Sequence, residues 1–310
     1  MAMIYDGKRK DLTICTMLFK LPGQQNLSAI KGGNRNFEEF YLSSLKKLCE
    51  TFNHVALWCD KETADYLKKA GLSEKINMRV MKISDLPHWN EREDCRKILY
   101  TMKKYVGFFL HKKSPEQWVD YLPLTWAKPA IIDWAAKHNK FKSDYFMWMD
   151  AGALSPKYAN SAMWDNWDGH IVAKPKRVRM TIAVTLGKSH PRFVPRFMYD
   201  LYKFLFVKPI QPATADRLAN QNMIDIAMVN ADYDVPAGSF MVPKEKANDF
   251  WCAFERARKI MKKHNLVCVE QGIFQTMMKF DTEDMFELKY IHGYTGLYAA
   301  IAGKSYDIDL

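Results

Sequence analysis

Short apolar runs alternate along the first half of the chain with segments whose apolar residues recur at helical spacing. Strands are predicted over 11–19, 54–60 and 76–83, where apolar residues dominate. Helices are predicted between them, over 36–52 and 61–71, from apolar residues three and four positions apart. This strand–helix–strand–helix–strand order predicts a mostly parallel sheet with right-handed crossovers.

The segment 144–154, DYFMWMDAGAL, combines the most apolar strand candidate with a carboxylate. Tyr145–Met149 shows no polar alternation, which is typical of a strand buried on both faces. Asp150 then lies at the carboxyl end of that strand, where open α/β sheets bind their ligands. The small residues Ala151 and Gly152 come next, and we interpret them as room for a ligand to approach the backbone.

The helix that leads into this strand is predicted to begin near Trp126, because Pro129 fits only the first turn of a helix. An earlier helix is predicted over 91–110. After Gly152 the pattern changes to shorter strands and two long helices, which predicts a mixed C-terminal half. The candidate elements there are strands within 169–175, 178–186 and 233–243, helices over 244–265 and 268–280, and a last strand from 285.

Two blocks of sequence resemble a known family. Residues 126–153, WAKPAIIDWAAKHNKFKSDYFMWMDAGA, are similar to the central motif of the HtrL/YibB (WlaTC-type) glycosyltransferase-like family, a Trp-x-Lys helix followed by a strand ending Trp-Ile/Met-Asp-Ala-Gly. Residues 235–278 resemble the glycine-containing strand, the helix and the Glu-Gln segment of that family. Together the blocks span most of 120–290. The resemblance implies a GT-A-like nucleotide-sugar transferase with an α/β, Rossmann-like fold.

The same resemblance implies one domain over 1–310, with a nucleotide-binding half (1–150) and an acceptor-binding half (151–310). It also implies a divalent cation, Mn²⁺ or Mg²⁺, held by Asp150 and by His292 of the C-terminal segment IHGYTG. Typical GT-A enzymes carry Asp-x-Asp at this strand end, whereas this chain has Asp-Ala-Gly. The second carboxylate is missing, so the sequence leaves metal dependence open.

Transfer of a sugar from a nucleotide builds positive charge on the sugar and negative charge on the leaving diphosphate, which calls for a cation near the diphosphate. The donor-binding candidates besides the segment 150–152 and His292 are Lys128, in the family motif, and Arg35, where the glycine loop of KGGNRNF meets a helix start. Glu270 is the candidate base, with Gln271 beside it to hold the acceptor. The alternatives are a solvated loop charge at Arg35 and a Glu270 that stabilises a helix N-terminus.

The net charge of +11 and the pI of about 9.2 favour a polyanionic partner. The segment 174–208 carries nine Lys and Arg against one acid, so its first members are predicted to contact the acceptor: Lys174, Lys176, Arg177 and Arg179. This bias slightly favours a hydroxymethylated base in DNA, as in bacteriophage DNA modification. Lipopolysaccharide or another surface glycan is the alternative acceptor. A non-enzymatic nucleic-acid-binding protein is the alternative of another class.

Charged residues over 6–11 interrupt the first apolar run before it reaches the length of a signal peptide, and no later run reaches that of a membrane-spanning helix. The six cysteines are scattered without a Cys-x-x-Cys pair, which is typical of reduced thiols. We therefore expect a cytoplasmic protein, in the host cytoplasm if it is viral. The sequence does not determine its oligomeric state.

Overall fold

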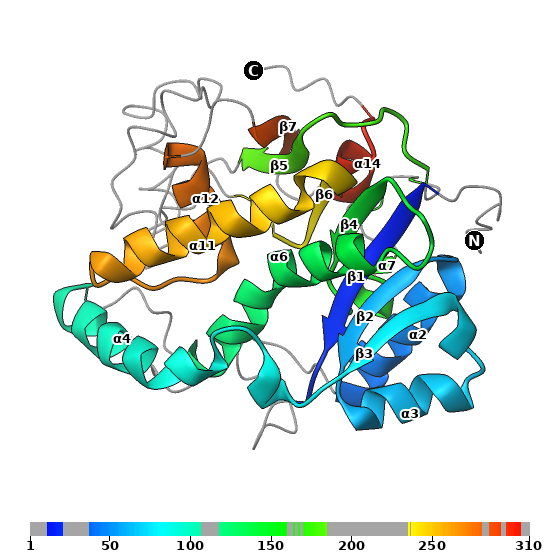
Figure 1. The fold of residues 1–310 in the computed structure, drawn as a ribbon, viewed down its shortest axis with the longest axis horizontal. Helices are drawn as coiled ribbons and strands as arrows, with labels where there is room; N and C mark the ends of the chain where they lie inside the picture. Colours follow the sequence, from blue (N-terminus) through cyan, green and yellow to red (C-terminus); the bar gives the residue numbers. More distant parts are fainter. Residues whose placement is uncertain are drawn as a thin grey trace, which may run out of the picture.

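The computed structural model describes residues 11–20, 37–106, 118–159, 164, 167, 170–184, 235, 237–280, 285–292 and 296–304. Seven strands form one sheet in this part of the chain, in the order β3-β2-β1-β4-β6-β5-β7 (Figure 1). The strands are β1 (Leu12–Leu18), β2 (Val55–Cys59), β3 (Ile76–Val80), β4 (Tyr145–Met149), β5 (Val178–Val184), β6 (Ser239–Pro243) and β7 (Phe286–His292).

The first four strands pair in parallel, as the sequence predicts. β1 lies between β2 and β4, and β3 pairs with the far side of β2. β6 runs antiparallel to both of its neighbours, β4 and β5, whereas β5 and β7 pair in parallel. The predicted fold class, an α/β fold with a mostly parallel sheet and a mixed C-terminal half, is confirmed.

Helices cover both faces of the sheet. The helices longer than one or two turns are α2 (Ser43–Thr51), α3 (Lys61–Lys69), α4 (Arg92–Val106), α6 (Tyr121–His138), α11 (Ala247–Lys263) and α12 (Glu270–Phe280). The shorter ones are η1 (Phe37–Leu42), η2 (Ser73–Lys75), η3 (Ile83–Asp85), η4 (Trp89–Glu91), α7 (Pro156–Ala159), η5 (Lys244–Lys246) and α14 (Leu297–Ile301).

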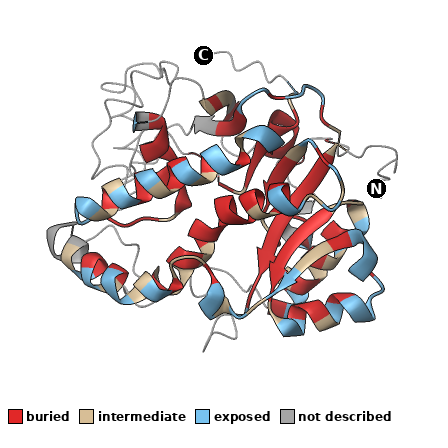
Figure 2. Cartoon of the chain, viewed as in Figure 1, coloured by how far each residue is buried: buried red, intermediate tan, exposed pale blue. Residues whose placement is uncertain are grey.

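Two hydrophobic cores lie on opposite faces of the sheet, because neighbouring strand residues alternate between the faces. Phe146 and Trp148 of β4 belong to the core beneath α6, α11 and α12, whereas Met147 and Met149 belong to the core beneath α2, α3 and α14. Figure 2 shows β1, β2 and β4 as almost continuously buried, whereas the edge strand β3 is mostly half-buried or exposed. This explains why the segment Tyr145–Met149 is apolar at every position.

Helix α6 differs from its prediction. It begins at Tyr121, five residues before the predicted start at Trp126, and carries Pro129 in its interior. Most of its residues are buried on all sides, so packing outweighs the backbone hydrogen bond that proline removes. The strand expected within 169–175 is also wrong, because residues 170–175 follow no regular structure.

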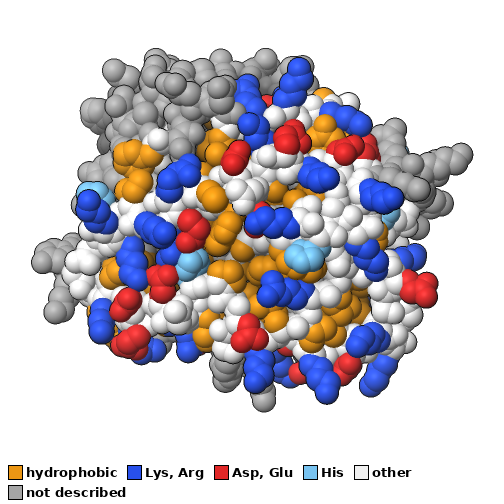
Figure 3. Space-filling model, in the orientation of Figure 1, with side chains coloured by type: hydrophobic (Ala, Val, Ile, Leu, Met, Phe, Trp, Pro, Cys, Tyr) orange, Lys and Arg blue, Asp and Glu red, His pale blue; other side chains and the backbone are white. Residues whose placement is uncertain are grey.

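In the described ranges, no helix combines the length and the apolar character needed to cross a bilayer. All six cysteines are free thiols, and Cys252 alone among them is exposed. Lys and Arg side chains are spread over the face shown in Figure 3 rather than gathered in one patch. On this face the positive charge therefore does not by itself locate a binding surface.

Candidate active site at the carboxyl edge of the sheet

Asp150 follows β4 directly, at the carboxyl edge of the parallel strands. Its backbone N–H donates to the carbonyl of Gly238, the residue before β6, over 3.3 Å. Because Phe146 and Trp148 face α6, the next alternate position places the Asp150 side chain on the α6 side as well. The predicted position of Asp150 at the end of a buried central strand is confirmed.

Lys128 of α6 joins two of the predicted site residues. Its Nζ donates hydrogen bonds to Asp150 Oδ1 over 3.0 Å, to Glu270 Oε1 over 2.6 Å and to the carbonyl oxygen of Ala237 over 2.9 Å. These three acceptors match the three protons of an ammonium group. Three residues singled out from distant parts of the sequence thus form one cluster, which we call the Lys128 triad: Lys128, Asp150 and Glu270.

The triad carries a net charge of −1, since one ammonium group lies between two carboxylates. Burial alone would lower the pKa of Lys128, but the negative charges of Asp150 and Glu270 outweigh it and hold that pKa above its ordinary value. Trp148 adds an indole N–H that donates to the same Asp150 Oδ1 over 2.9 Å. The ammonium also lies 5.2 Å from the Trp148 ring centroid. One oxygen of Asp150 is thereby fixed by two donors.

The two carboxylates of the triad differ in their access to solvent. The side chain of Asp150 is 38% exposed, whereas that of Glu270 is 7% exposed and that of Lys128 is 8% exposed. A general base must reach the proton that it removes. Asp150 meets this requirement better than Glu270, whose carboxylate is held inside the protein by Lys128. Gln271, the predicted acceptor contact, follows Glu270 in the first turn of α12 and is half-buried.

The small residues after Asp150 have a structural explanation that differs from the predicted one. A Cβ added to Gly152 would lie 2.7 Å from Phe40 Cε1, so the aromatic ring already fills the space beside this glycine. Ala151 is buried in the core beneath α2 and α14. The interpretation of this pair as room for a ligand is therefore replaced by packing against η1.

The described part of the basic segment lies away from Asp150. Lys174 Nζ is 3.3 Å from Asp11 Oδ2 and 5.8 Å from the Tyr145 ring, and both partners mark the amino ends of their strands. Along β4, Tyr145 and Asp150 are about 16 Å apart. Lys176 and Arg177 are exposed and precede β5, at the same amino edge.

Arg179 is buried within the protein. Its guanidinium pairs with both oxygens of Glu287 at 3.2 and 3.3 Å and donates to the carbonyls of Ala173 and Ile301. The predicted contacts of Lys174 and Arg179 with the acceptor therefore gain no support from these positions and stay predictions. The acceptor-binding prediction has no support from Lys176 and Arg177 either, since they lie at the amino edge.

Two predicted site residues, Arg35 and His292, have side chains outside the described residues. Arg35 lies outside the described residues, as does the basic segment from 185 onward. The backbone of His292 ends β7 opposite Val184, at the carboxyl edge of the sheet, but its side chain is outside the described set.

The described residues at Asp150 do not fit a resident divalent cation. Such ions take several oxygen ligands, and the described side chains contain no group of three or more His, Cys, Asp and Glu placed to hold a metal ion. Asp150 Oδ1 already accepts from Lys128 and Trp148, and the ammonium 3.0 Å away repels a second cation. The metal ligation predicted for Asp150 and His292 thus gains no support.

A second charged cluster escaped the sequence reasoning, and we call it the charge clasp: His88, Glu91, Glu255, Arg258 and Lys262. Both ring nitrogens of His88 contact carboxylates at 2.8 Å, and Arg258 bridges Glu91 and Glu255 at 3.0 to 3.2 Å. The clasp joins η4 to α11. Its two halves, His88 with Glu91 and the three residues of α11, are separated by more than 160 residues, and no local motif connects them.

No family model matches the chain, and no curated protein matches it. Solved structures are similar to it, among them two enzymes. Mouse xyloside xylosyltransferase 1 in its apo form is 14% identical, with 90% of this chain and 84% of that chain covered and a TM-score of 0.38. The 4-diphosphocytidyl-2C-methyl-D-erythritol synthase of Anaerococcus prevotii is 10% identical, with 94% and 97% covered and a TM-score of 0.34. At these values neither likeness carries an argument about activity, and the HtrL/YibB resemblance stays a prediction.

Proposed function

We propose that this chain is a glycosyltransferase that uses a nucleotide sugar and places the Asp150 carboxylate against its substrates. The observation that carries the proposal is the Lys128 triad itself. A half-exposed carboxylate at the carboxyl edge of a parallel sheet is held by a buried ammonium and an indole N–H. Burying two charged residues is expensive unless they act together, and such arrangements cluster at functional sites.

Within this proposal, Asp150 is the catalytic carboxylate. When the bond between the anomeric carbon and the diphosphate breaks, positive charge grows on the sugar, and a fixed negative charge nearby stabilises it without reorganisation. The same carboxylate is exposed enough to hydrogen-bond a hydroxyl of the donor or to take the proton of the acceptor. Lys128 holds this carboxylate in place, and Glu270 balances the charge of Lys128.

The leaving diphosphate needs a cation that the triad does not supply, because all three protons of Lys128 are already donated. We keep Arg35 as the proposed diphosphate contact, since a glycine loop before a helix start suits an anion. The proposed domain is the whole chain, residues 1–310. The triad draws Lys128 and Asp150 from the N-terminal half and Glu270 from the C-terminal half.

The acceptor is the narrower part of the proposal. The DNA acceptor was favoured because of the basic segment, and its described members, Lys174 to Arg179, lie at the other edge of the sheet or inside the protein. We therefore propose an acceptor with a hydroxyl group. A surface glycan and a hydroxymethylated base in DNA are both tested as that acceptor. Salt dependence separates them, because phosphate contacts with DNA release counterions and weaken steeply with salt.

Thermal unfolding with a panel of nucleotide sugars tests the donor. A ligand at a hundredfold excess over its Kd stabilises the protein by about 2.7 kcal/mol, which gives a clear rise in Tm. The matched pair of variants is Asp150→Asn and Asp144→Asn, because these aspartates flank β4 at its two ends. We expect one nucleotide sugar to raise the Tm of the wild type and of Asp144→Asn, and Asp150→Asn to lose most of that rise.

Parallel samples with Mn²⁺ and with EDTA show whether the donor brings a metal ion. If no nucleotide sugar stabilises the protein in either condition, the transferase proposal fails. Tight, salt-sensitive DNA binding that survives Asp150→Asn would then support the nucleic-acid-binding alternative.

A further inference from the structure

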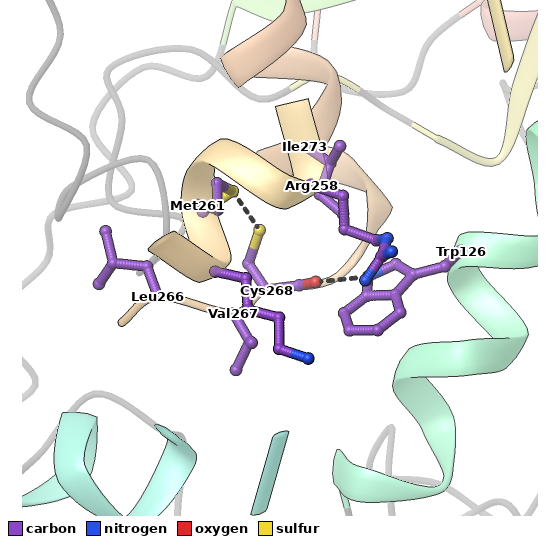
Figure 4. A pocket seen from close by; sticks show the side chains of 8 residues that line it. Trp126, Arg258, Met261, Leu266, Val267, Cys268 and Ile273 are labelled. Carbon is purple, nitrogen blue, oxygen red and sulfur yellow. Dashed lines mark hydrogen bonds between the residues drawn. The ribbon is translucent and has the colours of Figure 1, made fainter. Parts of the chain in front are cut away.

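The segment that carries Glu270 into the triad is anchored by a tryptophan on α6. Trp126 Nε1 donates to the carbonyl oxygen of Cys268 over 2.8 Å, and both residues are buried. Figure 4 shows the indole nitrogen of Trp126 directed at that carbonyl. Residues 266–269 have no regular structure, so their carbonyls depend on such contacts.

The spacing on the two sides of this contact is the same. Trp126 lies two residues before Lys128 on α6, and Cys268 lies two residues before Glu270 at the start of α12. One segment therefore meets the other twice, through an indole N–H on a carbonyl and through an ammonium on a carboxylate. The first contact fixes the backbone from which the second contact is made.

Two residues of the charge clasp also lie against the indole ring. The guanidinium of Arg258 lies 5.3 Å from the ring centroid of Trp126, and the His88 ring lies 6.1 Å away in an edge-on orientation. Glu91 and Glu255 fix Arg258 in turn. A small pocket lined by Trp126, Arg258 and Cys268 lies at this junction (Figure 4). The ring is thus clamped, so its N–H has little freedom to leave the carbonyl.

We infer that Trp126 is a positioning residue that sets the place of Glu270, so that Glu270 in turn holds Lys128 against Asp150. The effect of Trp126 on catalysis rests on the proposed function. The effect of Trp126 on the contacts of Lys128 does not, because these contacts exist whether or not the chain is a transferase. Loss of the indole N–H leaves the Cys268 carbonyl without this donor and loosens the first turn of α12.

The test measures how fast the Lys128 amine reacts with an acylating reagent, read by mass spectrometry against Lys137 as an internal reference. Lys128 is 8% exposed with its amine engaged, whereas Lys137 is 57% exposed. We expect Trp126→Phe to raise the relative labelling of Lys128 about tenfold, which corresponds to ~1.4 kcal/mol of easier local opening. Trp134→Phe is the control, since Trp134 lies on the same helix and packs on Trp58.

A second substitution separates the N–H from the ring. Benzothienylalanine at position 126 keeps the shape of tryptophan and replaces the N–H by sulfur. Because the packing is kept, this protein can be studied even if Trp126→Phe is too unstable. The inference predicts that both substitutions at position 126 raise the rate of Lys128 labelling and that Trp134→Phe leaves this rate unchanged. Labelling of Lys128 at the wild-type rate in the benzothienylalanine protein overturns it, because the N–H would then have no effect on the triad.

Enzyme kinetics give an independent result. A positioning role predicts that the benzothienylalanine protein keeps its KM for the nucleotide sugar and loses kcat by about tenfold. If no nucleotide sugar is turned over by the wild type, the proposed function fails while the labelling result still decides the role of Trp126.

Discussion

Replacing Lys128 by Met removes the ammonium of the triad and keeps most of the aliphatic stem. Glu270 is then left as a buried carboxylate that has lost its cation, 2.6 Å from the vacated position. Breaking a buried ion pair from one side costs about 3–5 kcal/mol. A folded protein has roughly 5–15 kcal/mol of stability in total. We therefore expect Lys128→Met to lose a large part of the free energy of unfolding.

The double variants identify which carboxylate is responsible. Lys128→Met combined with Glu270→Gln removes the buried charge as well, so the two changes should be non-additive, with a favourable coupling of about 1–3 kcal/mol. Lys128→Met with Asp150→Asn should recover less than about 1 kcal/mol, because water solvates the 38% exposed Asp150 side chain in the single variant. Glu270→Gln and Asp150→Asn alone complete the two cycles.

The assay is equilibrium unfolding in urea at pH 7, followed by far-UV circular dichroism, with the slope compared between variants. Lys128 stays charged at this pH, since its pKa is raised. Its stabilisation is fully present below about pH 10.5 and is lost as the pH rises above that. A loss below about 1 kcal/mol for Lys128→Met, or strict additivity with Glu270→Gln, would refute the reasoning about the triad.

Three further predictions concern packing and charge. Gly152→Ala should destabilise the protein by about 1–3 kcal/mol by pressing on Phe40, and Phe40→Leu should relieve part of that loss in thermal unfolding. Arg179→Lys should lower the Tm through the lost pairing with Glu287 but leave binding to a heparin column unchanged, whereas loss of retention would show a surface role. Burial would raise the pKa of Glu91, but the cations of the charge clasp lower it to about 2, so Glu91→Gln should be least stable relative to wild type above pH 4.5. In urea titrations the free energies of unfolding of the wild type and of Glu91→Gln should converge as the pH falls toward 2. A difference that stays constant with pH would contradict this.

The strand pattern could be predicted from the sequence because β1, β2 and β4 are buried and mostly apolar along their length, and because β3 follows the same strand–helix order. Tyr145–Met149 is β4 to the residue, and Asp150 follows at the carboxyl edge as expected. The start of α6 could not be predicted. Pro129 lies inside that helix, and burial of the helix on all sides explains why the proline is tolerated there.

The residues of the candidate site could be selected from the sequence, but the contacts between them could not. Lys128, Asp150 and Glu270 were each selected for a separate role, as diphosphate contact, strand-end carboxylate and base. Their mutual contacts depend on α6 and α12 packing on the same face of β4, which no local pattern encodes. Once Lys128 is known to touch both carboxylates, its predicted role shifts from the diphosphate to the support of Asp150.

The acceptor contacts predicted from the basic segment gain no support, for a related reason. Charge density along the sequence says nothing about which edge of the sheet a segment reaches. Lys174 precedes β5, and the direction of β5 carries it to the amino edge beside Asp11. Gly152 shows the same limit, because the ring that fills the space beside it comes from Phe40, more than 100 residues earlier in the chain.

The most direct test of the central claim is the release of nucleoside diphosphate from nucleotide sugars by the wild type, Asp150→Asn and Asp144→Asn. Each donor is incubated with mixed glycan acceptors, with hydroxymethylated DNA and with water alone. The account predicts that one donor is consumed by the wild type and by Asp144→Asn, and that Asp150→Asn is slower by at least about a hundredfold, as expected for loss of a group that acts on the reacting atoms. Release at the wild-type rate by Asp150→Asn, or no release from any donor by the wild type, would contradict it.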